Sequence, residues 1–123
     1  MSFTYDVIDH VQLAAPVGGE DKARMFYKDL LGFQEIDKPP LLKKNGGVWF
    51  QAGFVHIHIG IEDPFIPAKK AHPAFRIHHI EELMAYLDEK EILYKNDERL
   101  PGANRFYLTD PFGNRLEFLE WEE

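Results

Sequence analysis

The sequence contains no cysteine, which excludes disulfide bonds, thiolate metal ligands and thiol nucleophiles. It also has no excess of basic residues, and its net charge is −7. A general nucleic-acid partner is therefore not expected, because neutralising phosphates requires a basic surface. No apolar run approaches the roughly 20 residues of a membrane span. The stretch MSFTYDVIDH lacks the form of a signal peptide. We therefore expect a cytoplasmic protein without a membrane partner.

What remains is a soluble composition with abundant imidazole and carboxylate groups. The 123 residues are 45% hydrophobic and 28% charged, which predicts one globular domain of ordinary size. Six histidines and 21 acidic residues are present. If the protein binds a transition metal, the ligands must therefore be imidazole and carboxylate.

The predicted elements follow one order twice: a strand, a helix and three further strands. In the first half the expected strand 6–14 precedes a helix 20–31 and strands 33–36, 48–52 and 54–62, with a loop at 37–47. In the second half the strand 72–78 precedes a helix 80–90 and strands 92–95, 105–109 and 115–121. We expect a single domain, 1–123, in which module one covers about 5–62, a linker 63–71, and module two 72–123.

Four potential ligands fall at matching places of this repeat. His10 and His72 each lie in the predicted first strand of a half, and His56 and Glu117 lie in the last strands. Side chains alternate between the two faces of a strand, so His58 shares the face of His56. In each of these strands the apolar face can pack on a helix while the polar face lines a cavity.

Several stretches together resemble the vicinal oxygen chelate superfamily, which includes glyoxalase I, bleomycin- and fosfomycin-resistance proteins and extradiol dioxygenases. They are DHVQLAA, FYKDLLGFQE, HIHIGIE, AHPAFRI and LTDPFGNRLEFLEW, of which DPFGNRLEF is the most specific. The resemblance implies an α+β fold in which two βαβββ modules form a curled mixed sheet around a cleft.

The resemblance also implies one divalent metal, held by residues of the first and last strand of each module. Carried onto this sequence, those positions are His10, His56, His72 and Glu117, with His58 as the alternative to His56. Such a donor set suits Fe, Mn, Zn, Ni or Co. Glu117 is the candidate to move a proton in catalysis.

Strand parity adds candidate substrate contacts on the same face. Arginines there would bind a carboxylate or phosphate, so a small anionic substrate is consistent with the sequence. The substrate-binding candidates are His58, Arg76, Arg105, Tyr107, Arg115 and Phe50.

Three functions follow from these residues and the resemblance. The first is a glyoxalase-type lyase or isomerase that acts on a small substrate with adjacent oxygen atoms. The second is an extradiol-type ring-cleaving dioxygenase, with Fe(II) on His10, His72 and Glu117. The third is a metal-free small-molecule binding protein of the bleomycin-resistance type. We expect a homodimer, and the modules can pair within one chain or across that dimer.

Overall fold

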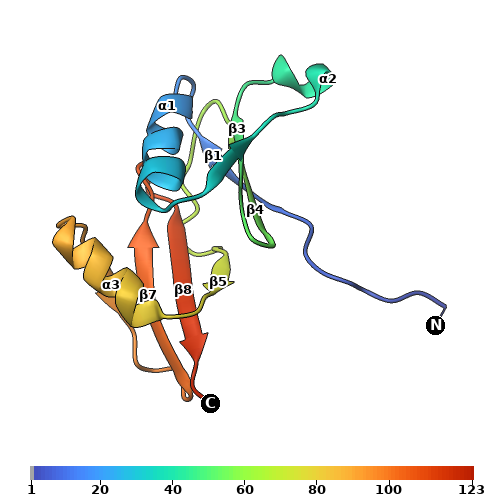
Figure 1. Ribbon diagram of the computed structural model, residues 1–123. Helices are drawn as coiled ribbons and strands as arrows, with labels where there is room; N and C mark the ends of the chain where they lie inside the picture. Colours follow the sequence, from blue (N-terminus) through green and yellow to red (C-terminus); the bar gives the residue numbers. More distant parts are fainter. Residues whose placement is uncertain (1) are drawn as a thin grey trace. The chain divides into compact units, whose positions relative to one another are not determined.

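The computed structural model describes residues 2–123, which form two compact units with a boundary between Ile66 and Pro67. Each unit contains one four-stranded mixed sheet with a helix on one face (Figure 1). The predicted α+β fold with two βαβββ modules is therefore confirmed. Among residues 2–123, no helix has the length and apolar character needed to cross a membrane.

The first unit has the strand order β1-β4-β3-β2, with β1 parallel to β4 and the other pairs antiparallel. Its elements are β1 (Val11–Ala15), α1 (Glu20–Ala23), the π-helical segment η1 (Arg24–Leu30), β2 (Gln34–Ile36), α2 (Pro40–Lys43), β3 (Val48–Ala52) and β4 (Val55–Ile61). The expected helix 20–31 is thus observed as α1 continued by η1. The short helix α2 lies in the segment predicted as a loop, and Pro40 suits its first turn because that position needs no N–H partner.

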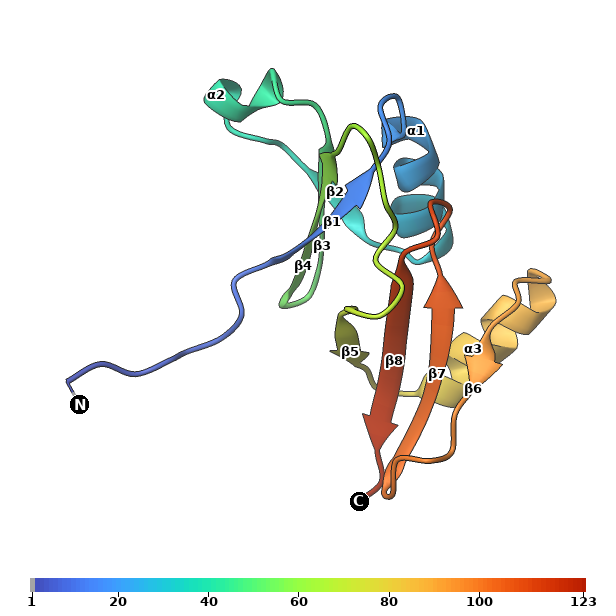
Figure 2. The same cartoon turned by 180° about the vertical axis from the view of Figure 1, so that it is seen from behind.

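The second unit repeats this arrangement with the order β5-β8-β7-β6, and β5 is parallel to β8. Its elements are β5 (Ala74–Arg76), α3 (Ile80–Glu89), β6 (Lys95–Asn96), β7 (Ala103–Thr109) and β8 (Arg115–Trp121). Figures 1 and 2 show α3 along the sheet that contains β7 and β8.

The two first strands are shorter than predicted, and both histidines precede them. His10 comes directly before β1, and His72 lies two residues before β5. Pro73 has no N–H to donate, but its carbonyl accepts a hydrogen bond from the Glu117 N–H at 3.0 Å. The pairing with β8 therefore extends past the short strand and holds the backbone beside His72.

Each sheet buries its helix-facing side in an aromatic and aliphatic core. In the first unit, the fully buried Phe50 ring stacks on Tyr27 of η1 at 5.5 Å. In the second, Phe106 stacks on Phe118 at 5.2 Å. The expectation that Phe50 contacts substrate does not agree with this position, because parity puts its neighbour Trp49 on the face of His58.

The carboxylate of Glu120 caps the N-terminus of α3. Its two oxygens accept hydrogen bonds from the N–H groups of His79 and Ile80, both at 3.0 Å. The hydrogen bond from Ile80, followed by that from His79, lowers the pKa of Glu120 below its usual range. His79 itself has a left-handed backbone conformation, with a φ of 61°.

Replacing Phe50 should test whether it belongs to the core. Phe50→Ala leaves a cavity against Tyr27 and should lower the free energy of unfolding by about 3–5 kcal/mol in urea denaturation. The matched control is Phe54→Ala, because Phe54 is fully exposed between β3 and β4 and its loss should change stability by less than about 0.5 kcal/mol. Equal effects of the two substitutions would contradict the assignment of Phe50 to the core.

The cap formed by Glu120 should give a pH-dependent contribution to stability. Because the folded-state pKa is lowered, the contribution is complete above the unfolded value of about 4.3 and is lost as pH falls through the folded value. Glu120→Gln should therefore be less stable than the parent at pH 6, and the difference should shrink towards pH 3. A difference that stays constant over this range in urea titrations would contradict the cap.

Candidate functional site

The strand registers identify which residues of the two units are equivalent. The hairpin of the first unit pairs Trp49 with His58, and that of the second pairs Tyr107 with Glu117. In both cases the aromatic residue lies on the penultimate strand and the potential ligand on the last. His56 lies one side-chain pair further along the first hairpin, opposite Gln51.

The parallel strand pairs lead to the same correspondence. Gln12, two residues after His10, pairs with His58. Ala74, two residues after His72, pairs with Glu117. Counting from the leading histidine of each unit therefore makes His58 the counterpart of Glu117. Sequence spacing alone suggested His56, because His10 and His56 are 46 positions apart, close to the 45 positions between His72 and Glu117, whereas His10 and His58 are 48 positions apart.

In the first unit the structure brings His10 together with His58. Their rings stack with centroids 4.1 Å apart, and Trp49 stacks on His58 at 3.9 Å. The Nδ1 of His10 lies 2.9 Å from a carboxylate oxygen of Asp9 and can donate to it. This hydrogen bond leaves the Nε2 of His10 available as a metal ligand.

The environment of His58 favours its neutral form. Burial, followed by the neighbouring imidazoles of His10 and His56, lowers the pKa of His58 to about 4. Metal ligation needs the neutral imidazole, since a protonated ring has no free lone pair. His58 is therefore ready to act as a ligand at neutral pH without first losing a proton.

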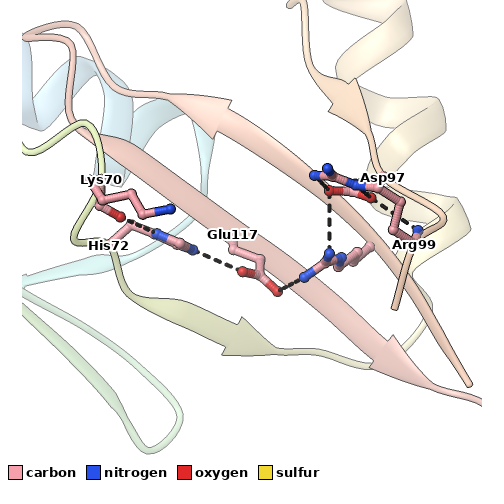
Figure 3. A network of polar contacts seen from close by, with 6 residues as sticks. Lys70, His72, Asp97, Arg99 and Glu117 are labelled. Carbon is pink, nitrogen blue, oxygen red and sulfur yellow. Dashed lines mark hydrogen bonds and ion pairs between the residues drawn. The ribbon is translucent and has the colours of Figure 1, made fainter. Parts of the chain in front are cut away.

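In the second unit His72 and Glu117 are in direct contact (Figure 3). The Nδ1–H of His72 donates to the carbonyl of Lys70 at 2.9 Å, which fixes the ring orientation. The Nε2 of His72 lies 2.9 Å from the Oε1 of Glu117. With Nδ1 donating to Lys70, the Nε2 of His72 and the Oε1 of Glu117 both have lone pairs that could bind one metal ion.

Arg105 and Asp97 hold the other oxygen of Glu117 in place. Arg105 donates to the Oε2 of Glu117 at 3.3 Å, and it forms an ion pair with the buried Asp97 at 3.2 Å. Asp97 also accepts from the side chain of Arg99 at 2.8 and 2.6 Å. These hydrogen bonds from Arg99 hold the pKa of Asp97 well below its usual range. Glu117 is therefore oriented from both sides.

Aromatic contacts link this network to further basic residues. The ring of Tyr107 lies edge-on to His72 with centroids 5.6 Å apart. The guanidinium of Arg115 lies 4.0 Å from the Tyr107 centroid, which is close enough for a cation–π interaction. Arg76, another predicted substrate contact, is exposed on β5 opposite Leu119.

Two functional candidates were absent from the sequence prediction. Trp49 is the neighbour of the predicted contact Phe50, and the burial of Phe50 identifies Trp49 as the residue on the face of His58. Asp97 follows a very short strand in an irregular segment, where no periodicity indicates the direction of its side chain. Its contact with Arg105 depends on tertiary packing.

The donor set fits a divalent transition metal. Two imidazoles in one unit and an imidazole with a carboxylate in the other are suitable ligands, and two of the histidines bind an oxygen acceptor through Nδ1. Among residues 2–123, no three histidine or acidic side chains gather closely enough to hold an ion. The described candidates thus form two pairs, His10 with His58 and His72 with Glu117.

Comparison with known proteins identifies the family. The model of the Glyoxalase/Bleomycin resistance protein/Dioxygenase superfamily matches residues 7–118. The chain belongs to this superfamily. The resemblance inferred from the motifs is therefore confirmed. A search of curated proteins found no significant match.

Solved structures of the superfamily have the same fold. A glyoxalase family protein from Bacillus anthracis is 50% identical, with a TM-score of 0.95, and the match covers 99% of this chain and 100% of that one. A glyoxalase family protein from Enterococcus faecalis is 28% identical, with a TM-score of 0.74, 94% coverage of this chain and 98% of the other. A lactoylglutathione lyase from Agrobacterium tumefaciens is 23% identical, with a TM-score of 0.66 and coverage of 89% and 90%, which shows a shared fold.

Two substitutions that each remove one charge from the network around Glu117 should have unequal effects on the melting temperature. Asp97→Asn should lower the melting temperature clearly, since it removes one of the two buried carboxylates that neutralise the poorly exposed Arg105. Arg99→Gln should have a small effect, because Arg99 is 82% exposed and Arg105 still neutralises Asp97. Thermal denaturation of both variants at neutral pH measures this order, and the reverse order would contradict the proposed network.

Proposed function

We propose that this member of the superfamily is a divalent-metal-dependent enzyme, a lyase or isomerase acting on a small substrate with adjacent oxygen atoms. The observation that carries the proposal is the occurrence of two potential ligand pairs at equivalent register positions of the two sheets. One pair is His10 with His58, and the other is His72 with Glu117. A repeated core fold alone does not require titratable groups at the same positions twice.

The proposed ligands are His10, His58, His72 and Glu117. We prefer His58 to His56 because His58 stacks on His10 and pairs in register with β1 at the position corresponding to Glu117. The hydrogen bonds from the Nδ1 atoms of His10 and His72 support ligation through their Nε2 atoms. The donor set suits Fe, Mn, Zn, Ni or Co.

Glu117 is the proposed proton-transfer group. When bound, the metal supplies positive charge that polarises a carbonyl and acidifies a neighbouring C–H bond. Glu117 can accept a proton on Oε1, the oxygen that lies 2.9 Å from the Nε2 of His72. Arg105 holds Oε2, and so it fixes the direction in which Oε1 points. Arg105 is accordingly a positioning residue.

The second candidate function is ring cleavage by an extradiol-type dioxygenase. It is favoured by one observation, the position of the His58 ring, which stacks on the candidate ligand His10 and on Trp49. In this function His10, His72 and Glu117 would hold Fe(II), and His58 would serve as an acid–base group. Oxygen consumption with catechols and an iron requirement would distinguish it from the lyase or isomerase.

The proposal also covers the location, oligomeric state and partner of the protein. We propose a cytoplasmic homodimer with a small-molecule substrate. Modules of about 5–62 and 72–123 would together supply the four ligands, from one chain or from two. If the purified protein contains no divalent metal and gains no thermal stability from any added metal, it is instead a metal-free binding protein of the bleomycin-resistance type.

Matched histidine variants test the metal site. After dialysis against Mn, Co, Ni or Zn, bound metal is measured by mass spectrometry in the parent, His58→Gln, His56→Gln and His72→Ala. We expect His58→Gln and His72→Ala to lose more than about tenfold in metal affinity, as is typical when a ligand or its support is removed. His56→Gln is the control and should retain metal. Unchanged metal content in His72→Ala would contradict the assignment.

A fluorescence measurement gives an independent readout. In a Trp121→Phe background, Trp49 is the remaining tryptophan and it stacks on His58. Binding of Co or Ni should quench its emission in a saturable way. A flat titration, together with metal bound elsewhere on the chain, would exclude His58 as a ligand.

A further inference from the structure

A cavity of about 830 Å³ lies on the second unit, and its lining includes Tyr107, the strand partner of Glu117. Such a volume is typical of small-molecule sites, which span roughly 300–1,000 Å³. It is lined by Lys69, Leu93, Tyr94, Lys95, Asp97, Arg99, Tyr107, Thr109, Gly113 and Arg115. None of the four ligands proposed above belongs to this lining, so the cavity is an additional feature of the unit.

The cavity shares a face of the sheet with the proposed metal ligand. Across the strands, Lys95 pairs with Tyr107, and Tyr107 pairs with Glu117. Residues paired in this way project from the same face of a sheet. Thr109 and Arg115 form the next such pair and project from that face as well. A ligand in the cavity would therefore lie beside the carboxylate that we propose for proton transfer.

The lining is strongly basic although the whole chain is acidic. It contains four lysine or arginine side chains and one carboxylate, in a protein of net charge −7. The carboxylate, Asp97, is already neutralised by Arg99 and Arg105. Lys69, Lys95 and Arg115 form no ion pair with any residue from 2 to 123. Three cations without counter-charges therefore line one cavity.

Arg115 is the best-positioned of these cations. Its guanidinium lies over Tyr107 at 4.0 Å, an arrangement that limits its motion without using its N–H donors on a carboxylate. Those donors match the two oxygens of a carboxylate or phosphate. Leu93, exposed and also in the lining, adds an apolar contact for a carbon skeleton.

We propose that this cavity binds the carboxylate or phosphate group of the substrate, with Arg115 as its main contact and Lys69 and Lys95 beside it. The inference rests on the proposed function, because it names the substrate class of the same site. The substrate is then an anion whose charged group lies in the cavity while its adjacent oxygens lie near Glu117.

Titration of the protein in EDTA tests the cavity without metal. Phenyl phosphate and benzoate are the probes, benzyl alcohol is the neutral control, and amide chemical shifts from NMR report binding. We expect saturable shifts around Arg115 and Tyr107 with either anion, no such shifts with benzyl alcohol, and weaker binding at high salt. Arg115→Gln should weaken binding roughly tenfold, as expected when a charge-assisted hydrogen bond is lost.

A second variant and a matched control keep the test decisive. Lys95→Gln changes an exposed residue of β6 and should weaken anion binding even if Arg115→Gln does not fold. Lys22→Gln removes an exposed lysine of α1 and should leave binding unchanged. Equal affinities in the parent, Lys95→Gln and Arg115→Gln, or equal shifts with benzyl alcohol, would overturn the proposal.

The experiment separates this inference from the proposed function. Anion binding in EDTA by a protein that takes up no metal would support the cavity and reject the metalloenzyme. Metal uptake by a protein that shows no anion binding would reject the cavity as an anion site and support the metal site.

Discussion

The parallel pairing of the first and last strand in each unit is the constraint on which the candidate site depends. It sets β1 against β4 and β5 against β8, so a residue just before a first strand meets a residue in the middle of a last strand. His10 stacks on His58 and His72 contacts Glu117 for this reason. A shift of one residue in either register would turn the last-strand ligand into the core.

Around this shared framework the two units differ in charge. The first surrounds its pair with aromatic groups, so that burial lowers the pKa of His58 to about 4 and keeps the ring neutral. The second surrounds its pair with a network of arginines and Asp97 that orients a carboxylate. The first pair therefore contains a neutral imidazole, and the second contains a carboxylate held by an arginine.

Sequence patterns were sufficient for the fold and the family. The repeated order of elements and the motif DPFGNRLEF correctly predicted two βαβββ modules of the superfamily. They were not sufficient to decide between His56 and His58, since both share a face and register depends on which backbone groups pair across strands. The core position of Phe50 and the ion pair of Asp97 with Arg105 could not be predicted either, because each depends on packing between distant segments.

The measurement that tests the account most directly is anomalous diffraction from a crystal of the Co(II)-loaded protein. The account predicts strong density within bonding distance of the proposed ligands, which are the Nε2 of His10 and the ring of His58 in the first unit, and the Nε2 of His72 and a carboxylate oxygen of Glu117 in the second. A peak coordinated by His56 in place of His58, or a metal bound away from Glu117, would contradict it.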